Sequence, residues 1–112
     1  MSFPRAPQAP ETDTGRLAAA LEEGAVLIDV RRPEEYVEMH VPGAVLIPLH
    51  ELGARAEEVP KGERVYVICA AGSRSLAAVQ ALNEAGWDTV SVAGGTAAWA
   101  ADGRPVRTGP EA

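Results

Sequence analysis

The chain is poor in cysteine, because Cys69 is the only one among its 112 residues. A disulfide within the chain is therefore excluded, which is typical of proteins kept in a reducing cytosol, and we expect a cytoplasmic location. The lone thiol also has no second cysteine that could resolve an adduct. Any group bound covalently to Cys69 must be removed by an external molecule.

Membrane, metal and nucleic-acid features are also missing from the sequence. No apolar run is long enough to span a membrane, and residues 1–13 lack the basic stretch and apolar core of a signal peptide. The two histidines, His40 and His50, are too far apart to suggest a metal cluster, so we expect no metal. The net charge of −6 argues against general binding to nucleic acid or to an anionic membrane.

The apolar pattern predicts a single α/β domain. Short apolar runs typical of buried strands alternate with helical patterns, and glycine and proline separate them. This alternation indicates a mostly parallel central sheet with helices on both faces. The expected strands cover residues 26–28, 44–47, 65–68 and 89–92. The expected helices begin at 13 or 14 and end at 23, and then cover 33–39, 51–58, 76–85 and 96–101.

The two ends of the chain show less regular apolar periodicity than the middle. Residues 1–12 contain three prolines and no periodicity, which predicts an extended N-terminal arm with a short edge strand near Gln8. We place the folded domain at 13–107 and a C-terminal tail at 108–112.

Cys69 stands where the strand at 65–68 gives way to a helical pattern, and it opens the segment Cys-Ala-Ala-Gly-Ser-Arg-Ser. Successive N–H groups in such a loop form an anion-binding nest, and a helix N-terminus adds its positive end. Both lower the pKa of a thiol and make it a nucleophile. A lone cysteine is often only a small buried hydrophobe, but the polar run from Gly72 to Ser75 favours a reactive one.

Three segments in this order resemble the single-domain rhodanese (sulfurtransferase) family over most of the chain, from about Asp13 to Pro105. The first is Asp29–Tyr36 followed by His-Val-Pro-Gly-Ala at 40–44, the second is the Cys69 loop, and the third is Gly94–Trp99. The resemblance implies a rhodanese-like fold for residues 13–107.

The resemblance also implies an activity. Cys69 would take a sulfane sulfur from thiosulfate or a persulfide donor, hold it as a persulfide, and pass it to cyanide or a thiol. No metal or organic cofactor is implied, and a sulfur-relay protein is a further conceivable partner. The catalytic residue would be Cys69, and the substrate-binding loop would comprise Ala70, Ala71, Gly72, Ser73, Arg74 and Ser75.

Around this loop the resemblance implies a supporting framework of Asp29, Arg31, Glu35, His40, Gly94, Gly95 and Trp99. Two roles for Arg74 stay open. It attracts an anionic donor, or it pairs with Asp29 or Glu35 and holds the loop, which suits a planar guanidinium better. A catalytic dyad of His40 with one of these carboxylates is the less favoured interpretation.

Two other functions stay open as alternatives. Cysteine-dependent phosphatases and arsenate reductases place cysteine and arginine six positions apart, whereas Cys69 and Arg74 are five apart, which suits one sulfur atom better. A rhodanese-fold module that only docks partners often lacks the cysteine. Several relatives carry a charged or polar residue where this chain has Ala70 and Ala71, so the sulfur donor is left open.

Overall fold

The computed structural model describes residues 9–112, and within them a five-stranded parallel sheet forms the centre of the molecule. The strand order is β1-β5-β4-β2-β3, so the first strand lies at one edge beside the last. The strands are β1 (Glu11–Thr12), β2 (Val26–Asp29), β3 (Val45–Leu46), β4 (Arg64–Ile68) and β5 (Asp88–Val92). The mostly parallel sheet predicted from the sequence is confirmed.

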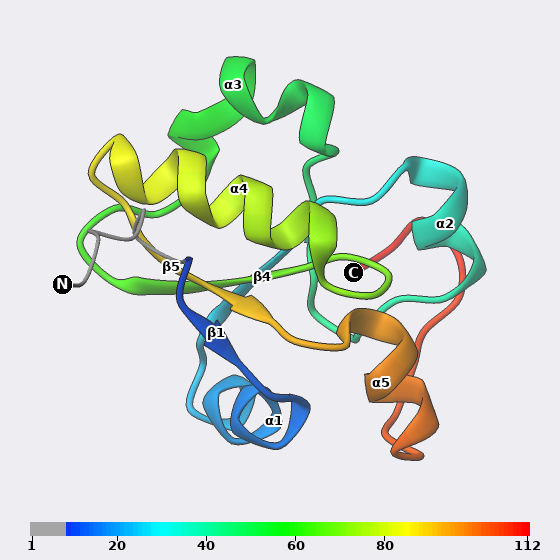
Figure 1. The fold of residues 1–112 in the computed structure, drawn as a ribbon. Helices are drawn as coiled ribbons and strands as arrows, with labels where there is room; N and C mark the ends of the chain where they lie inside the picture. Colours follow the sequence, from blue (N-terminus) through cyan, green and yellow to red (C-terminus); the bar gives the residue numbers. More distant parts are fainter. Residues whose placement is uncertain (1–8) are drawn as a thin grey trace, which may run out of the picture.

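Helices cover both faces of the sheet, as the alternating pattern predicted. Figure 1 shows α3 and α4 on one side, α1 and α5 on the other, and α2 at the end toward which β4 runs. The helices are α1 (Thr14–Glu22), α2 (Pro33–Glu38), α3 (Leu52–Arg55), α4 (Ser73–Glu84) and α5 (Gly95–Ala101), and the 3-10 turns η1 (Leu49–Glu51) and η2 (Ala56–Glu58) flank α3. Within the described part of the chain, no helix is long and apolar enough to cross a membrane.

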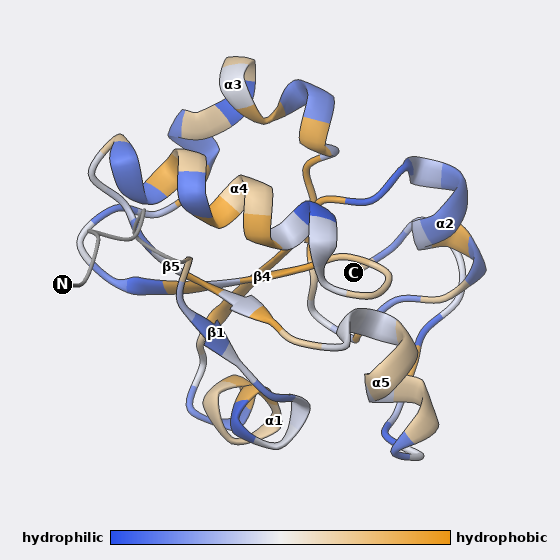
Figure 2. Ribbon diagram, viewed as in Figure 1, coloured by the Kyte–Doolittle hydropathy of each residue, from blue (hydrophilic) through white to orange (hydrophobic). Residues whose placement is uncertain are grey.

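The core divides into two apolar clusters because side chains alternate across each strand. On β2, Ile28 joins the cluster under α3 and α4, while its neighbour Leu27 joins the cluster that contains Leu17 and Trp99. All four side chains are almost completely buried. Figure 2 shows the most hydrophobic stretches along the central strands, whereas α2 is mostly hydrophilic. Trp99 is therefore a core residue, as predicted.

Helix α4 begins three residues earlier than the apolar pattern predicted. Gly72 precedes the helix with φ of +114°, a left-handed conformation that glycine adopts without strain, and the chain turns directly into the helix at Ser73. The first turn has the sequence Ser-Arg-Ser, so it carries no apolar periodicity. The expected helix at 51–58 was also wrong in detail, since it is broken into η1, α3 and η2.

The two ends of the described chain pair with different parts of the fold. The edge strand expected near Gln8 lies outside the described residues, and the edge strand that the structure contains is Glu11–Thr12, paired with β5. Near the C-terminus, Arg107 forms a backbone bridge with His40, and the Gly109 N–H donates to the carbonyl of Val37 at 2.7 Å. Residues 107–109 therefore lie against α2. The division into arm, domain and tail stays a prediction.

Candidate functional site

Cys69 lies at the carboxyl end of β4, where the chain turns into α4. Cys69 is only 1% exposed, and its Sγ accepts a hydrogen bond from the Gly72 N–H at 3.0 Å. The Ser75 hydroxyl lies 3.4 Å from the same sulfur. The sulfur thus lies inside a tight loop, in contact with a backbone N–H of the loop and with a hydroxyl of the first helical turn.

A buried pair of serines supports this sulfur. The Ser75 Oγ lies 2.7 Å from the Ser91 Oγ on β5 and 3.0 Å from the Gly72 carbonyl oxygen. The Gly72 carbonyl accepts the Ser75 proton, and a hydroxyl has only one proton to give. A proton donated by Ser91 to Ser75 Oγ would leave the Ser75 proton to be shared between this carbonyl and a charged sulfur. Sequence reasoning missed Ser91, although a serine between Val90 and Val92 is a polar residue in an apolar strand.

Burial and hydrogen bonding act on the Cys69 thiol in opposite directions. Burial is the largest single influence and raises the pKa of the Cys69 thiol, because the charged form loses contact with water. Hydrogen bonds from the Ser75 side chain and from the backbone of Ser75, Gly72 and Ala71 lower that pKa, and together they outweigh burial. The loop therefore makes this thiol more acidic than an ordinary cysteine.

The acidity of this thiol can be measured by its alkylation. Because only the thiolate is nucleophilic, the rate of reaction with iodoacetamide should rise with pH around a midpoint below the ordinary cysteine value of about 8.5. The Ser75→Ala variant should move the midpoint upward, since it removes one donor. A wild-type midpoint at or above the ordinary value would show that burial prevails. A small uncharged reagent is needed, because Cys69 is nearly inaccessible.

The start of α5 fixes the backbone of the loop. The Thr96 N–H donates to the Cys69 carbonyl at 2.9 Å, and the Ala97 N–H donates to the Ala70 carbonyl at 3.0 Å. Gly94 and Gly95 make the turn before them with positive φ, and Gly95 is buried against the loop. The prediction of a tight turn here is confirmed, but its direct contact with the Cys69 loop was not foreseen.

Arg74 pairs with Glu35 and not with Asp29. The two guanidinium nitrogens Nη1 and Nη2 donate to the two Glu35 oxygens at 2.6 and 2.9 Å, a bidentate geometry. These hydrogen bonds are the main cause that holds the pKa of Glu35 at about 2. The folded pKa lies below the unfolded one, so the pair stabilises the fold at neutral pH and loses this contribution as the pH falls toward 2.

Replacement of Arg74 by lysine should show whether activity depends on the bidentate pair that holds the loop or only on the positive charge. Lysine keeps the positive charge but cannot form the two parallel bonds, so the loop loses its link to α2. We expect much of the transfer activity to be lost. The melting temperature should fall by only a few degrees, because the pair is about a third exposed and such pairs contribute about 1 kcal/mol or less.

Arg55→Lys is the matched control for this variant, because Arg55 forms a similar bidentate pair with Glu58 at 2.7 and 2.9 Å on α3 and η2. It should change the melting temperature slightly and leave transfer unchanged. Full activity of Arg74→Lys with only a higher KM for an anionic donor would instead assign Arg74 to anion attraction.

The remaining framework residues form a separate buried network. The Arg31 guanidinium donates to Asp29 at 2.9 Å and to the Met39 carbonyl at 2.7 Å, which ties the end of β2 to the end of α2. His40 is fully buried and stacked on Tyr36, and its ring nitrogens lie 2.7 Å from the carbonyls of Tyr36 and Glu111. The His40 ring is thus bound by two backbone carbonyls, and among residues 9–112 neither Asp29 nor Glu35 is hydrogen-bonded to it. The supporting role of Asp29, Arg31 and His40 stays a prediction.

Metal-ligand clusters are not found within residues 9–112, where no group of three or more His, Cys, Asp and Glu residues could hold a metal ion.

A basic pocket of about 290 Å³ lies at the end of the sheet where β2 and β4 finish, which is also the end that carries Cys69. It joins the end of β2, the start of η1 and the first turn of α4, three segments distant in the sequence. Its lining residues are Val30, Arg31, Arg32, Pro48, Leu49, His50 and Arg74. Sequence analysis did not find this pocket. The pocket could not be recognised in the sequence, because Arg32 and His50 belong to segments distant from the Cys69 loop.

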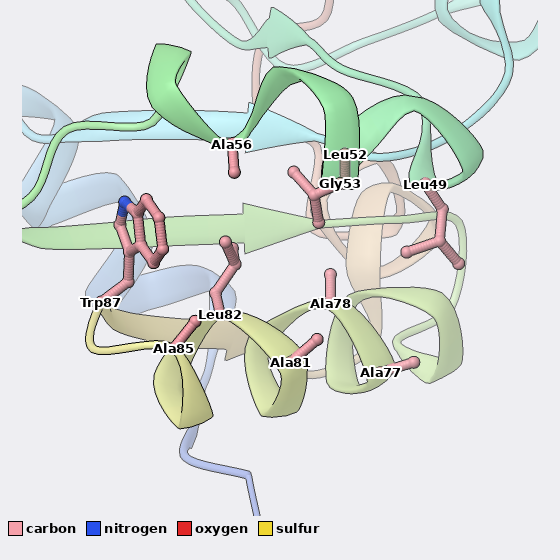
Figure 3. Close-up of a pocket in the computed structure, with 10 residues that line it drawn as sticks. All are labelled: Leu49, Leu52, Gly53, Ala56, Ala77, Ala78, Ala81, Leu82, Ala85 and Trp87. Atoms are coloured by element: carbon pink, nitrogen blue, oxygen red, sulfur yellow. The ribbon is translucent and has the colours of Figure 1, made fainter.

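An apolar groove of about 320 Å³ lies between α3 and α4. Figure 3 shows Leu52 and Ala56 on one side and Ala78, Ala81 and Leu82 on the other. Leu49 lines both this groove and the basic pocket. The lining of the groove carries no charged side chain, whereas the lining of the basic pocket includes Arg74 of the Cys69 loop.

Known proteins share both the sequence pattern and the fold. Residues 13–102 match the family model of the rhodanese-like domain. A sulfurtransferase from Allochromatium vinosum is 35% identical over 85 residues, which cover 75% of this chain and 79% of that protein. The thiosulfate sulfurtransferase PspE from Escherichia coli is 49% identical over 70 residues, which cover 61% of this chain and 67% of that one.

Among solved structures, the crystal structure of a rhodanese-related protein from Thermoplasma volcanium superposes with a TM-score of 0.82. Its sequence is 31% identical, and the match covers 88% of this chain and 97% of that one.

Proposed function

The chain belongs to the rhodanese-like domain family and is a rhodanese-type sulfurtransferase, and from this premise we propose that Cys69 carries the transferred sulfur as a persulfide. The observation that carries the proposal is the set of donors around Sγ, with the Gly72 N–H at 3.0 Å and the Ser75 hydroxyl at 3.4 Å. These donors stabilise a negative sulfur before and after transfer.

The proposed reaction has two steps. In the first, the Cys69 thiolate attacks the sulfane sulfur of thiosulfate, the S–S bond of thiosulfate breaks, and sulfite leaves with the electron pair. In the second, cyanide or a thiolate attacks the outer sulfur of the persulfide, and the electron pair of the broken bond returns to Cys69. Gly72, Ser75 and their neighbours in the loop hold the charge in both states.

Thiosulfate is the donor to test first, since it is the substrate named for the relative PspE. Incubation of the protein with thiosulfate should add the mass of one sulfur atom, and cyanide should remove it and yield thiocyanate. Intact-mass measurement records both steps. A protein that gains no sulfur from thiosulfate or from a small persulfide would contradict the proposal.

Phosphatase or arsenate reductase activity is less well supported. Cys69 and Arg74 are five positions apart, one fewer than such enzymes need, and the Arg74 guanidinium is engaged by Glu35. A purely docking module would have no use for the donors around Sγ. A sulfur-relay partner, a cytoplasmic location, and the absence of metal, cofactor, nucleic-acid and membrane partners stay predictions from the sequence.

A further inference from the structure

Ser91 places a fully buried hydroxyl on β5, and its backbone is held on both sides. It pairs with Val67 of β4 on one side and with Glu11 of β1 on the other. A hydroxyl buried in this way has lost its water, which costs free energy unless a protein group replaces the lost hydrogen bonds. Among residues 9–112, the hydroxyl has one hydrogen-bond partner, the Ser75 Oγ at 2.7 Å. Ser91 is thus fixed in place and directed at a residue that contacts the sulfur.

The neighbours of Ser75 indicate which serine donates in this contact. The Gly72 carbonyl oxygen lies 3.0 Å from the Ser75 Oγ and can only accept, and the Cys69 sulfur lies at 3.4 Å. If Ser75 donated to Ser91, both of these acceptors would lose the only proton that Ser75 has. The Ser91 proton would then also be buried without an acceptor among the described residues, which is costly. Ser91 is therefore the donor and Ser75 the acceptor.

The charge on Sγ determines which acceptor the Ser75 proton faces. When Sγ is neutral, as a thiol or as the inner sulfur of a persulfide, it is a weak acceptor and the Gly72 carbonyl is preferred. When Sγ is a thiolate, the hydrogen bond to it is charge-assisted and is preferred instead. The Ser75 Oγ accepts from Ser91 in both positions, and a hydroxyl that accepts a hydrogen bond becomes a stronger donor.

We propose that Ser91 is a positioning residue for sulfur transfer. It holds the Ser75 hydroxyl as a donor with two positions, whose proton faces Cys69 Sγ while that sulfur is charged. The proton turns to the Gly72 carbonyl when Sγ bonds to the sulfane sulfur, and it turns back when the electron pair returns to Sγ. The hydroxyl only rotates, so its O–H bond stays intact. The part that concerns transfer rests on the proposed function, whereas the part that concerns the thiolate does not.

Alkylation of the thiol tests the inference without any sulfur donor. Ser91→Ala removes the donor and adds no atom to the packed strand, so the variant should fold. Its reaction with iodoacetamide should slow about twofold at a pH below the midpoint, because a smaller fraction of Cys69 is thiolate. Above the midpoint the rate should not fall, since the thiol is fully ionised there. A midpoint equal to that of the wild type, or an equal loss of rate at every pH, would overturn the inference.

A double variant tests whether Ser91 acts through Ser75. Ser75→Ala alone should raise the midpoint more than Ser91→Ala does, because it removes the hydroxyl that contacts Sγ. Adding Ser91→Ala to Ser75→Ala should change the midpoint no further, since the hydroxyl through which Ser91 acts is already absent. An equal effect of Ser91→Ala in both backgrounds would show that Ser91 reaches the sulfur by another route, and the inference would fail.

Two further variants separate the hydroxyl of Ser91 from its burial. Thr89 lies two residues earlier on the same face of β5, is equally buried, and donates to Asn83 Oδ1 at 2.7 Å. Thr89→Val removes this hydroxyl and keeps the shape of the side chain, so it should lower the melting temperature and leave the midpoint unchanged. Ser91→Thr keeps a hydroxyl and should keep the midpoint of the wild type. A shift in Thr89→Val as large as that in Ser91→Ala would contradict the assigned role.

Discharge of the persulfide measures the same contact during transfer. Protein loaded with sulfur from thiosulfate is mixed with cyanide, and thiocyanate formed in a single turnover is followed in time. Ser91→Ala should slow this step about threefold, because Sγ leaves as a thiolate that has weaker support. If the wild type takes up no sulfur, the proposed function fails, and the alkylation midpoints still decide the role of Ser91. If Ser91→Ala discharges sulfur at the wild-type rate and has an unshifted midpoint, only the role of Ser91 fails.

Discussion

Replacement of Cys69 by serine should abolish both the addition of sulfur from thiosulfate and the release of sulfite or thiocyanate. A serine hydroxyl is not ionised at neutral pH and cannot accept a sulfane sulfur as a stable persulfide. No second cysteine in the chain could substitute for the lost thiol. We therefore expect turnover to fall to the level of the uncatalysed reaction, measured as sulfite release, and the intact mass to remain unchanged after incubation.

The fold of this variant should survive, so that a loss of activity can be assigned to chemistry. The serine oxygen can accept the hydrogen bond that the Gly72 N–H now donates to Sγ, and the donors in the loop keep a partner. The melting temperature should stay within a few degrees of wild type. Arg16→Ala, which changes an exposed residue of α1 outside the loop, is the control that should keep its activity. Persistent sulfur transfer in Cys69→Ser would place the reactive group elsewhere.

The sequence was sufficient for the parts of this site that depend on local pattern. A run of apolar residues ending at Cys69, a glycine three positions later and a helical pattern beyond it predict a strand, a tight turn and a helix. These elements put the sulfur within 3.0 Å of a loop N–H. Resemblance of three short segments to one family then predicted the fold, because their order along the chain is specific.

Other parts of the site depend on how distant segments meet, and the sequence did not specify them. Arg74 had two possible acidic partners, and only the packing of α2 against the loop selects Glu35. Ser91 lies on another strand, and its contact with Ser75 follows from the position of β5 beside β4. Arg32 and His50 become neighbours of Arg74 only because β2 pairs with both β3 and β4.

Replacement of Gly95 by alanine should lower the free energy of unfolding more than any other substitution proposed for this protein. It should also lower the rate of sulfur transfer. A Cβ on Gly95 would meet the Cys69 carbonyl oxygen and would lie 2.6 Å from the Ala70 oxygen, closer than real Cβ atoms approach. Both carbonyls belong to backbone that accepts hydrogen bonds from Thr96 and Ala97, so they cannot move without breaking those bonds. Gly95 also has φ of +59°, which strains any residue with a side chain.

We expect Gly95→Ala to lower the free energy of unfolding by about 3 kcal/mol, the sum of overpacking and backbone strain. This corresponds to a fall in melting temperature of roughly 10–15 °C. Sulfur transfer should fall more than tenfold at a temperature where the variant is still folded, because the displaced carbonyls carry the loop that surrounds Sγ. Thermal unfolding and sulfite release measure the two effects separately.

Gly103→Ala isolates the steric part of this effect. Gly103 follows α5 with φ of +75°, yet a Cβ there would find no atom within 4 Å. This variant carries the same kind of backbone strain without the clash, so it should lose only about 1 kcal/mol and keep its transfer activity. If the two variants were destabilised equally, the close approach of Gly95 to the Cys69 loop would not contribute to the loss of stability. If Gly95→Ala lost stability but kept full activity, the start of α5 would support the fold without controlling the loop.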